Sequence, residues 1–594
     1  MNQVEPETPP GKIYDRRLAS RLAKYLYPYR WPVLASILLL ALVSGLKIVA
    51  PILTKIAIDD HIANSDVPGL IGIAQLLLLV LAFQFVLFFV QTYITNWTGQ
   101  KIMFDLRIEI FSHIQKLHLG YFDRIPVGRL ITRVTTDVDV LNELFTSGVV
   151  NIIGDLISLF GILIVMLWLD WRLALITFSV VPLIFLATIV FKIKVRNAYR
   201  KVRVAIARIN TFLQENVTGM SVVQIFVQEE RKLEEFKERN RDHLQANLAS
   251  ILYHAIYYPV ISLIAAVSTG LIVWYGGLKT LEGTLTLGVL VAFIQYSERF
   301  YKPISDLSEK FNILQNAMAS SERIFDLLDT APEIKESQNI VTLPNIEGSI
   351  EFKDVCFSYR PGIPIIKNVS FKISPEEKIA IVGATGSGKS TLINLLCRFY
   401  DVDSGEILID GTNIRELSLA QLRETIAVVL QDVFLFSGSV EENVKLWDRP
   451  ISDTDIEWAT QQVNAQTFIQ ALPEGYSTAV TERGSSLSVG QRQLLAFARA
   501  LAHSPQILVL DEATSSVDTE TEILIQDAVE KLMEDHTSLI IAHRLSTIQH
   551  CDRVLVLHKG EVIEEGTHRT LLNRHGVYRK LYELQFSTRE EIEA

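Results

Sequence analysis

Residues 383–390 read GATGSGKS and match the pattern G-x-x-x-x-G-K-[ST] without a gap. The apolar run at 378–382 predicts a buried strand before this stretch, and the apolar residues 392–396 predict a helix after it. Glycines allow the backbone to wrap around a phosphate chain with successive N–H groups turned toward it. The positive end of the helix dipole adds to that attraction. The stretch therefore predicts a phosphate-binding loop in a domain that binds ATP or a close relative.

This loop supplies most of the residues that we expect to bind the nucleotide. Lys389 is expected to reach the β- and γ-phosphates, and the hydroxyl of Ser390 is expected to bind Mg²⁺. ATP and Mg²⁺ are therefore the predicted cofactors. The predicted binding residues of the loop and of the start of its helix are Gly383, Ala384, Thr385, Gly386, Ser387, Gly388, Lys389, Ser390 and Thr391.

The composition divides the chain into two parts. Of its 594 residues, 49% are hydrophobic and the mean hydropathy is +0.26, which is too apolar for an ordinary soluble protein. The excess lies in long apolar runs before about residue 305, whereas the chain after about 345 has the short strands, helices and polar loops of a globular domain. The net charge of −11 gives no sign of nucleic-acid binding. The three cysteines have no C-x-x-C spacing, which argues against a zinc site or a disulfide framework.

Six apolar segments have, or nearly have, the ~20 residues needed to cross a bilayer. They lie near 31–53, 70–96, 146–169, 171–192, 251–275 and 285–303. The sixth gives the weakest signal because Glu298, Arg299 and Lys302 crowd its end. Between the third and the fourth segments only Asp170 and its neighbours remain, which predicts a tight outer hairpin.

The loops between these segments predict the orientation of the chain. The long connections 97–145 and 193–250 are rich in Lys and Arg, whereas the two opposite loops offer only Lys55 and Lys279. By the positive-inside rule, both chain ends and both long connections face the cytoplasm. The long connections also look helical, so we expect membrane helices to continue well into the cytoplasm.

These observations predict an α-helical membrane domain of six transmembrane helices with long cytoplasmic extensions, followed by an α/β P-loop ATPase domain. The predicted divisions are a cytoplasmic N-terminal segment at 1–30, a transmembrane domain at 31–325, a linker at 326–345, an ATP-binding domain at 346–585 and a C-terminal tail at 586–594. No cleavable signal peptide is evident. A bacterial inner (plasma) membrane is the expected location, with several passes and both termini in the cytoplasm.

Two carboxylates at the end of a predicted strand, 508–512, are the first candidates for catalysis. Asp511 is expected to hold Mg²⁺ through water, and Glu512 is expected to polarise the attacking water as the general base. A surface Asp-Glu pair is common by itself, but a phosphate loop in the same domain favours the catalytic interpretation.

Gln431, His543 and Tyr359 complete the predicted nucleotide site. Gln431 follows an apolar strand and is expected to sense the γ-phosphate and to bind Mg²⁺. His543 follows another apolar strand and is expected to contact the γ-phosphate, and Tyr359 is expected to stack on adenine. A single His or Tyr is more often structural, so these assignments depend on the other motifs.

Residues 485–493 read SSLSVGQRQ and identify the family. Together with the phosphate loop, the candidates above and the run SSVD at 515–518, this stretch closely resembles the signature set of ABC transporter ATPases, in order across roughly 345–585. The resemblance implies that Ser488, Gly490 and Gln491 contact the γ-phosphate on a partner's phosphate loop, and that Asp518 belongs to the nucleotide site. ATP is then sandwiched between two such domains, so one chain cannot form a complete site alone.

The membrane half resembles the exporter branch of that family, the six-helix half-transporters that include MsbA-like lipid exporters and multidrug exporters. The run YFDRIPVGRL at 121–130, with TDVD at 136–139, resembles the first coupling-helix region of that branch. FLQEN at 212–216 resembles the second region, and TERG at 481–484 resembles the loop through which exporter ATPases touch the coupling helices.

One position departs from the family's signature LSGGQ, because Val489 stands at its first glycine. Exporters built from two different subunits often have one altered signature, and the chain that carries it often keeps the glutamate, as this chain keeps Glu512. The alternative is a harmless variant in a homodimer. The predicted partner is a second half-transporter chain, with a heterodimer slightly favoured over a homodimer.

The resemblance implies ATP-driven export of hydrophobic or amphipathic compounds, drugs or lipids, by alternating access. Two alternatives remain open: import through an exporter-type fold, as in some siderophore systems, and an ATP-gated channel or sensor. Asp155, near the middle of the third span, is expected either to act on a cationic substrate or on one conformational state, or to make a helix–helix hydrogen bond.

Overall fold

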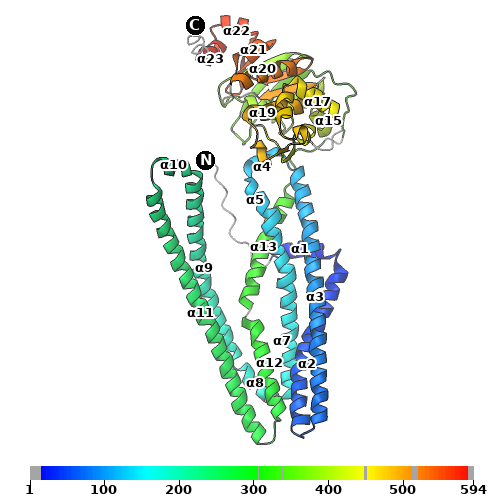
Figure 1. The fold of residues 1–594 in the computed structure, drawn as a ribbon, viewed down its shortest axis with the longest axis vertical. Coiled ribbons are helices and arrows are strands. Elements are labelled where there is room, and N and C mark those ends of the chain that lie inside the picture. Colours follow the sequence, from blue (N-terminus) through cyan, green and yellow to red (C-terminus); the bar gives the residue numbers. More distant parts are fainter. Residues whose placement is uncertain are drawn as a thin grey trace. The chain divides into compact units, whose positions relative to one another are not determined.

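The computed structural model describes residues 15–305, 307–336, 339–446, 451–511, 519–542 and 544–585 (Figure 1). These residues form two compact units. The helical unit contains 15–115 and 126–331, and the α/β unit contains 116–125 together with the described residues from 332 onward. The predicted fold class, a helical membrane domain followed by an α/β ATPase domain, is confirmed. The short segment 116–125 is grouped with the α/β unit although its chain neighbours on both sides belong to the helical unit.

The helical unit is built from long helices joined by short turns. Its α-helices are α1 (Arg16–Leu26), α2 (Arg30–Ile56), α3 (Val67–Lys116), α5 (Val127–Thr132), α6 (Val138–Glu143), α7 (Val150–Leu169), α8 (Trp171–Phe178), α9 (Val181–Thr218), α10 (Met220–Ile225), α11 (Glu229–Leu281), α12 (Leu287–Ser305) and α13 (Leu307–Asp329). The described residues also contain the π-helical segments η1 (Ala57–Ile62), η2 (Arg133–Asp137) and η3 (Leu144–Val149). The 50-residue α3 and the 53-residue α11 are about 75–80 Å long, well beyond the ~30 Å hydrocarbon core of a bilayer. The helical character predicted for the long connections is confirmed.

Among the described residues, five helical stretches are long and apolar enough to cross a membrane. They are Arg30–Ile62, Val67–Lys116, Val127–Leu169, Trp171–Thr218 and Glu229–Leu281. The sixth predicted span is the 19-residue α12, which lies outside this set. Its apolar side is nevertheless packed, because Phe293 and Tyr296 are fully buried in a cluster that also contains Met166 and Ile272.

The turn between the third and the fourth stretches has the tight form that the sequence predicts. Asp170 separates α7 from α8 and adopts an extended backbone conformation. Its carboxylate accepts a hydrogen bond from the backbone N–H of Leu173 at 2.8 Å and so caps the N-terminus of α8. Further along, α9 and α11 run side by side (Figure 1). The rings of Phe191 and Tyr257 stack between these two helices with their centroids 4.0 Å apart.

Asp137 is a buried acidic residue that ties η2 to α13. Its carboxylate accepts hydrogen bonds from the Ser320 hydroxyl at 2.8 Å and from Nε of Arg323 at 3.0 Å. Only 8% of the Asp137 side chain is exposed, so its carboxylate has lost most of its hydrating water. The hydrogen bonds from Ser320 and Arg323 compensate for that loss.

Replacing Asp137 with Ala should therefore destabilise the helical unit. The change leaves the Arg323 guanidinium and the Ser320 hydroxyl without their acceptor, at a cost of about 1–3 kcal/mol. The measurement is the thermal unfolding midpoint of the purified protein. Asp139→Ala is the matched control, because the exposed Asp139–Arg107 pair is expected to contribute under about 1 kcal/mol. Equal midpoints for the two variants would contradict this account of Asp137.

The α/β unit contains two main sheets. The larger has the order β12-β11-β3-β10-β9-β6 and the smaller the order β2-β1-β4-β5. Their strands are β1 (Ile350–Phe357), β2 (Ile366–Ile373), β3 (Lys378–Val382), β4 (Ser404–Ile409), β5 (Thr412–Asn413), β6 (Ile426–Val429), β9 (Ile507–Asp511), β10 (Thr537–Ile541), β11 (Arg553–His558) and β12 (Glu561–Gly566). In the larger sheet β11, β3, β10, β9 and β6 are parallel, and β12 is antiparallel to β11. The buried strands that the sequence predicts are present. Strand β3 leads into the phosphate loop, β9 ends at Asp511, and β10 lies just before position 543.

Helices surround these sheets and cover their apolar side chains. They are α4 (Leu119–Arg124), α14 (Lys389–Leu396), α15 (Leu419–Thr425), α16 (Val440–Lys445), α17 (Asp453–Gln462), α18 (Gln466–Ala471), α19 (Val489–Ala502), α20 (Thr519–Met533), α21 (Leu545–Gln549), α22 (His568–Asn573) and α23 (Val577–Gln585). The strands β9 and β10 are buried on both faces, as parallel strands covered by helices require.

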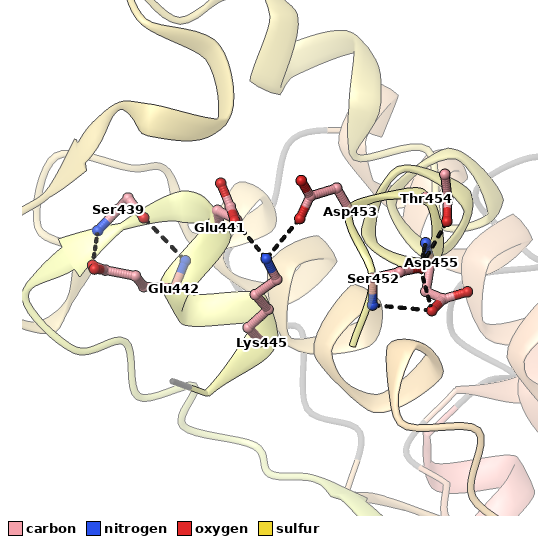
Figure 2. A network of polar contacts seen from close by, with 8 residues as sticks. All are labelled: Ser439, Glu441, Glu442, Lys445, Ser452, Asp453, Thr454 and Asp455. Atoms are coloured by element: carbon pink, nitrogen blue, oxygen red, sulfur yellow. Dashed lines mark hydrogen bonds and ion pairs between the residues drawn. The ribbon is translucent and has the colours of Figure 1, made fainter. Parts of the chain in front are cut away.

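A polar network joins α16 to α17 (Figure 2). Nζ of Lys445 bridges the carboxylates of Glu441 and Asp453, with a distance of 2.7 Å to each. Both helices also begin with capping boxes, Ser439 with Glu442 and Ser452 with Asp455. Since α16 and α17 both pack on α19, this network helps to set the position of the helix that begins at Val489.

Candidate functional site

The phosphate loop lies between β3 and α14, at the carboxyl edge of the parallel sheet. Gly386 and Gly388 adopt positive φ angles of +82° and +107°, a region that favours glycine. A Cβ on Gly388 would lie 2.8 Å from Cδ1 of Ile366, the end of a side chain that can move, so the backbone conformation is what requires glycine at this position. The sequence GATGSGKS therefore folds as a tight loop that leads directly into the N-terminus of α14, where backbone N–H groups attract anions.

Lys389 is the first residue of α14 and folds back over the loop. Its Nζ donates hydrogen bonds to the carbonyl oxygens of Gly383 at 2.8 Å and of Ala384 at 3.3 Å. Only 8% of Lys389 is exposed, and this burial lowers the pKa of its ammonium group, while the negative charge of Asp511 acts in the opposite direction. A phosphate chain beside this ammonium would favour its charged form.

Ser390 and Asp511 come together although they are far apart in the sequence. The Ser390 hydroxyl donates a hydrogen bond to Oδ2 of Asp511 at 3.4 Å. A hydroxyl and a carboxylate are the hard oxygen ligands that Mg²⁺ prefers. In addition, the buried hydroxyl oxygen of Ser387 has no hydrogen-bond partner among the described residues. The glycine turns, the Lys389 ammonium, this unsatisfied hydroxyl and the Ser390–Asp511 pair all fit a nucleoside triphosphate with Mg²⁺.

Tyr359 lies close to the same helix. Its hydroxyl donates a hydrogen bond to Oγ1 of Thr391 and accepts one from Nδ2 of Asn394, each at 3.3 Å. About 36% of Tyr359 is exposed, so part of its ring is open to a planar group. This position suits the adenine stacking that the sequence predicts, and it also gives Asn394 a role that the sequence did not indicate.

The other predicted site residues lie along the same sheet edge or at α19. Gln431 follows β6 and is exposed, next to the strand that ends in Asp511. Glu512, Asp518 and His543 lie outside the described residues. The strands that lead to Glu512 and His543 are β9 and β10, whose carboxyl ends are neighbours in the sheet.

At α19, Ser488 and Gln491 form a capping box with each other. Oγ of Ser488 accepts a hydrogen bond from the backbone N–H of Gln491 at 3.2 Å, and Oε1 of Gln491 accepts one from the backbone N–H of Ser488 at 2.9 Å. Gly490 is buried, whereas 46% of Val489 is exposed. The valine therefore leaves the helix start intact and projects from it.

Comparison with known proteins covers both halves of the chain. Residues 33–304 match the ABC transporter transmembrane region family, and residues 366–515 match the ABC transporter family of ATP-binding domains. The chain belongs to the ABC transporter family. The chain is 40% identical to an uncharacterized ABC transporter ATP-binding protein of Bacillus subtilis, over 96% of this chain and 94% of the relative.

Two further relatives have named activities. An ATP-dependent lipid A-core flippase of Syntrophus aciditrophicus is 36% identical over 95% of this chain and 94% of the flippase. A fatty acid ABC transporter ATP-binding/permease protein of Mycobacterium tuberculosis is 40% identical over 82% of this chain and 77% of the relative. The chain is thus a multi-pass membrane protein of the exporter type, with an ATP-binding domain fused to its transmembrane region.

Lys389→Ala should weaken ATP binding by about 10–100-fold, the value of a lost hydrogen bond to a charged group. The measurement is the dissociation constant for ATP with Mg²⁺ by titration calorimetry on the detergent-solubilised protein. The matched control is Lys372→Ala, which removes an exposed lysine from the neighbouring strand β2 and should bind ATP normally. Normal affinity in Lys389→Ala would exclude the proposed phosphate contact.

Proposed function

We propose that this chain is one half of an ATP-driven exporter that moves hydrophobic or amphipathic compounds, drugs or lipids, across a bacterial inner membrane. The phosphate loop with its Ser390–Asp511 pair carries this proposal, because that pair ties nucleotide binding to the sheet edge where hydrolysis takes place. The activities named for the relatives, lipid A-core flippase and fatty acid transporter, support an amphipathic substrate. The lysine- and arginine-rich long connections support cytoplasmic termini.

We assign the roles at the nucleotide to the residues that the sequence predicts for this site. Lys389 and the loop N–H groups bind the phosphates, Tyr359 stacks on adenine, and Glu512 takes the proton of the attacking water. Ser390, Gln431 and Asp511 would hold Mg²⁺, and the ion would neutralise charge on the phosphate oxygens. His543 contacts the γ-phosphate. ATP binding closes two such domains, the cavity opens outward, and hydrolysis resets the transporter.

Of the roles predicted for Asp155, this proposal keeps its action on one conformational state and drops the binding of a cationic substrate. Its carboxylate forms an ion pair with Lys310, so it joins α7 to α13 within the helical unit. A carboxylate that already has a cationic partner is poorly suited to bind a cationic drug. We therefore assign Asp155 to the stabilisation of one conformational state, since breaking a partly buried pair is costly.

Glu512→Gln should lower ATP hydrolysis by about 10²–10⁴-fold, the usual contribution of a general base. ATP binding should persist, because the amide keeps the shape of the side chain. The measurement is phosphate release in lipid nanodiscs by the chain assembled with its partner half-transporter, together with the ATP dissociation constant of the same sample. Hydrolysis at the rate of the unmodified protein would exclude Glu512 as the base.

We further propose that the functional unit is a heterodimer, on the grounds of the exposed Val489 at the N-terminus of α19. In this arrangement the isopropyl group faces the nucleotide on the partner's phosphate loop, where the family has glycine.

The expected result for the chain expressed alone is ATP binding with little hydrolysis. Val489→Gly should then raise phosphate release by about 5–150-fold, because one obstructing side chain costs about 1–3 kcal/mol. The alternative result, rapid hydrolysis by the unmodified chain that depends on Glu512, would mean that two copies form working sites and that the protein is a homodimer.

A further inference from the structure

The helices α2 and α12 pack against each other within the helical unit and carry three basic residues in their apolar spans (Figure 1). Lys47 belongs to α2, whereas Arg299 and Lys302 belong to α12. At about 1.5 Å per residue, Lys47 lies about 14 Å from the end of α2 at Ile56, and Arg299 lies about 18 Å from the start of α12 at Leu287. Both depths are near the middle of a ~30 Å hydrocarbon core, where charged side chains are costly and mark functional sites.

A proline in α2 explains how Arg299 is held. Pro51 has no backbone N–H, so the carbonyl oxygen of Lys47, four residues earlier, lacks its usual partner within the helix. The Arg299 guanidinium donates a hydrogen bond to that carbonyl oxygen. At the next residue, the carbonyl oxygen of Ile48 accepts a hydrogen bond from the Tyr296 hydroxyl at 2.5 Å. The proline therefore places a guanidinium beside the residue that carries the Lys47 ammonium.

The Lys47 side chain lies on the side of α2 that packs against other helices. Its neighbours one turn away, Val43, Ser44, Ala50 and Pro51, are all buried. Lys47 itself is exposed, so its ammonium group remains open to a ligand. Because the side of α2 that carries it is the packed one, this group is directed toward the other helices, as charged groups in membrane spans usually are.

Three positive charges lie together here, and the described carboxylates balance only part of them. Arg299 and Lys302 are both close enough to Lys47 for their charges to act against its own. Within the described part of the chain, the Arg299 guanidinium contacts a neutral carbonyl oxygen, and no carboxylate pairs with it or with the Lys47 ammonium. Glu298, next to Arg299, can offset one positive charge, and Asp155 of α7 is already engaged in an ion pair.

The surroundings of this basic cluster indicate which kind of anion it suits. Lys47 is flanked by the half-buried Leu46 and Ile48, and Arg299 is followed by the half-buried Phe300. A guanidinium binds a carboxylate or a phosphate through paired N–H groups, and an ammonium adds a point charge. The apolar side chains suit a hydrocarbon body attached to that anion, because a free hydrated ion gains nothing from them. A cationic group would be repelled.

We propose that Lys47, Arg299 and Lys302 form the subsite that receives the anionic head group, a carboxylate or a phosphate, of an amphipathic substrate. The inference deepens the proposed function and rests on it in one respect, that this chain moves amphipathic compounds. It narrows the substrate class, because the same cluster disfavours amphiphiles with a cationic head group. All three residues belong to one chain, so the subsite forms whatever the partner subunit is.

The test is saturation binding of radiolabelled palmitate to the full chain in phosphatidylcholine nanodiscs, with the signal of empty nanodiscs subtracted. The measurement is made at about pH 8, where the carboxylate is ionised. Lys47→Gln and Lys302→Gln should each weaken binding by about 10–100-fold, the value of one hydrogen bond to a charged group. Both changes leave the Arg299 side chain in place, so the bond that joins α12 to α2 persists.

Lys279→Gln is the matched control. Lys279 pairs with Glu282 at the end of α11, and its loss should leave palmitate binding unchanged. Competition then identifies the ligand. Unlabelled hexadecyl phosphate should displace palmitate, whereas inorganic phosphate, the methyl ester of palmitate and hexadecyltrimethylammonium should not displace it at the same concentration. The affinities of palmitate and hexadecyl phosphate show which head group, carboxylate or phosphate, the subsite prefers.

Unchanged affinity in Lys47→Gln and Lys302→Gln would overturn the inference. The absence of saturable palmitate binding would do the same, as would displacement of palmitate by the cationic amphiphile or by inorganic phosphate. The two proposals fail separately. If inverted vesicles with the complete transporter move only cationic or neutral compounds, the proposed export stands and the subsite is wrong. If the chain binds palmitate through these three residues but the vesicles move no amphiphile, the proposed export is wrong and the subsite stands.

Discussion

The pairing of β10 with both β3 and β9 fixes the geometry on which the nucleotide site depends. Ile541 of β10 pairs with Ile381 on one side and with Asp511 on the other, so the phosphate loop and the Asp511 carboxylate leave the sheet at the same level. A slip of one residue would turn every side chain of a strand to the opposite face. Because β9 and β10 are buried on both faces, such a slip would also disrupt their packing against the helices, and the register that joins Asp511 to Ser390 is thereby held by the core.

The helical unit depends on a different constraint, the neutralisation of charged groups among apolar helices. Its helix α13 carries Lys310, which pairs with Asp155 of α7, and Arg323, which pairs with Asp137 of η2. Near its end, Asp329 accepts two hydrogen bonds from Arg21 of α1. Buried ion pairs contribute little net stability but are costly to break, so they favour one arrangement over its neighbours. The first two pairs are partly buried and hold α13 against α7 and η2, whereas the exposed pair of Arg21 with Asp329 contributes under about 1 kcal/mol.

The sequence was sufficient where the signal is local. The strand, glycine turn and helix around Lys389 follow from the pattern of residues 378–396, and the capped turn at Asp170 follows from the short gap between two apolar runs. The contact of Tyr400 with Asp123 was beyond reach, because it joins residues 277 positions apart and nothing in the sequence around Tyr400 points to Asp123. The resemblance of 121–130 to a coupling-helix region implied that this segment meets the ATPase domain, but it did not indicate which residues make the contact. The sixth span gave a mixed signal because α12 is apolar on its packed side and carries Glu298, Arg299 and Lys302 near its end.

The N-terminus of α19 shows why a change at Val489 can affect function without affecting the fold. The capping box of Ser488 and Gln491 satisfies the helix start from within, so the helix forms without any ligand. Gly490, the second glycine of the family's signature, is present and buried, which keeps the backbone in close contact with the core. The valine side chain points outward and changes only what approaches this helix end from outside. A helix N-terminus attracts anions through its N–H groups and its dipole, and a β-branched side chain beside it limits how closely an anion can come. In the dimer that we propose, a phosphate group on the partner would approach this helix end, so the effect of Val489 would arise there and not in the folding of the single chain.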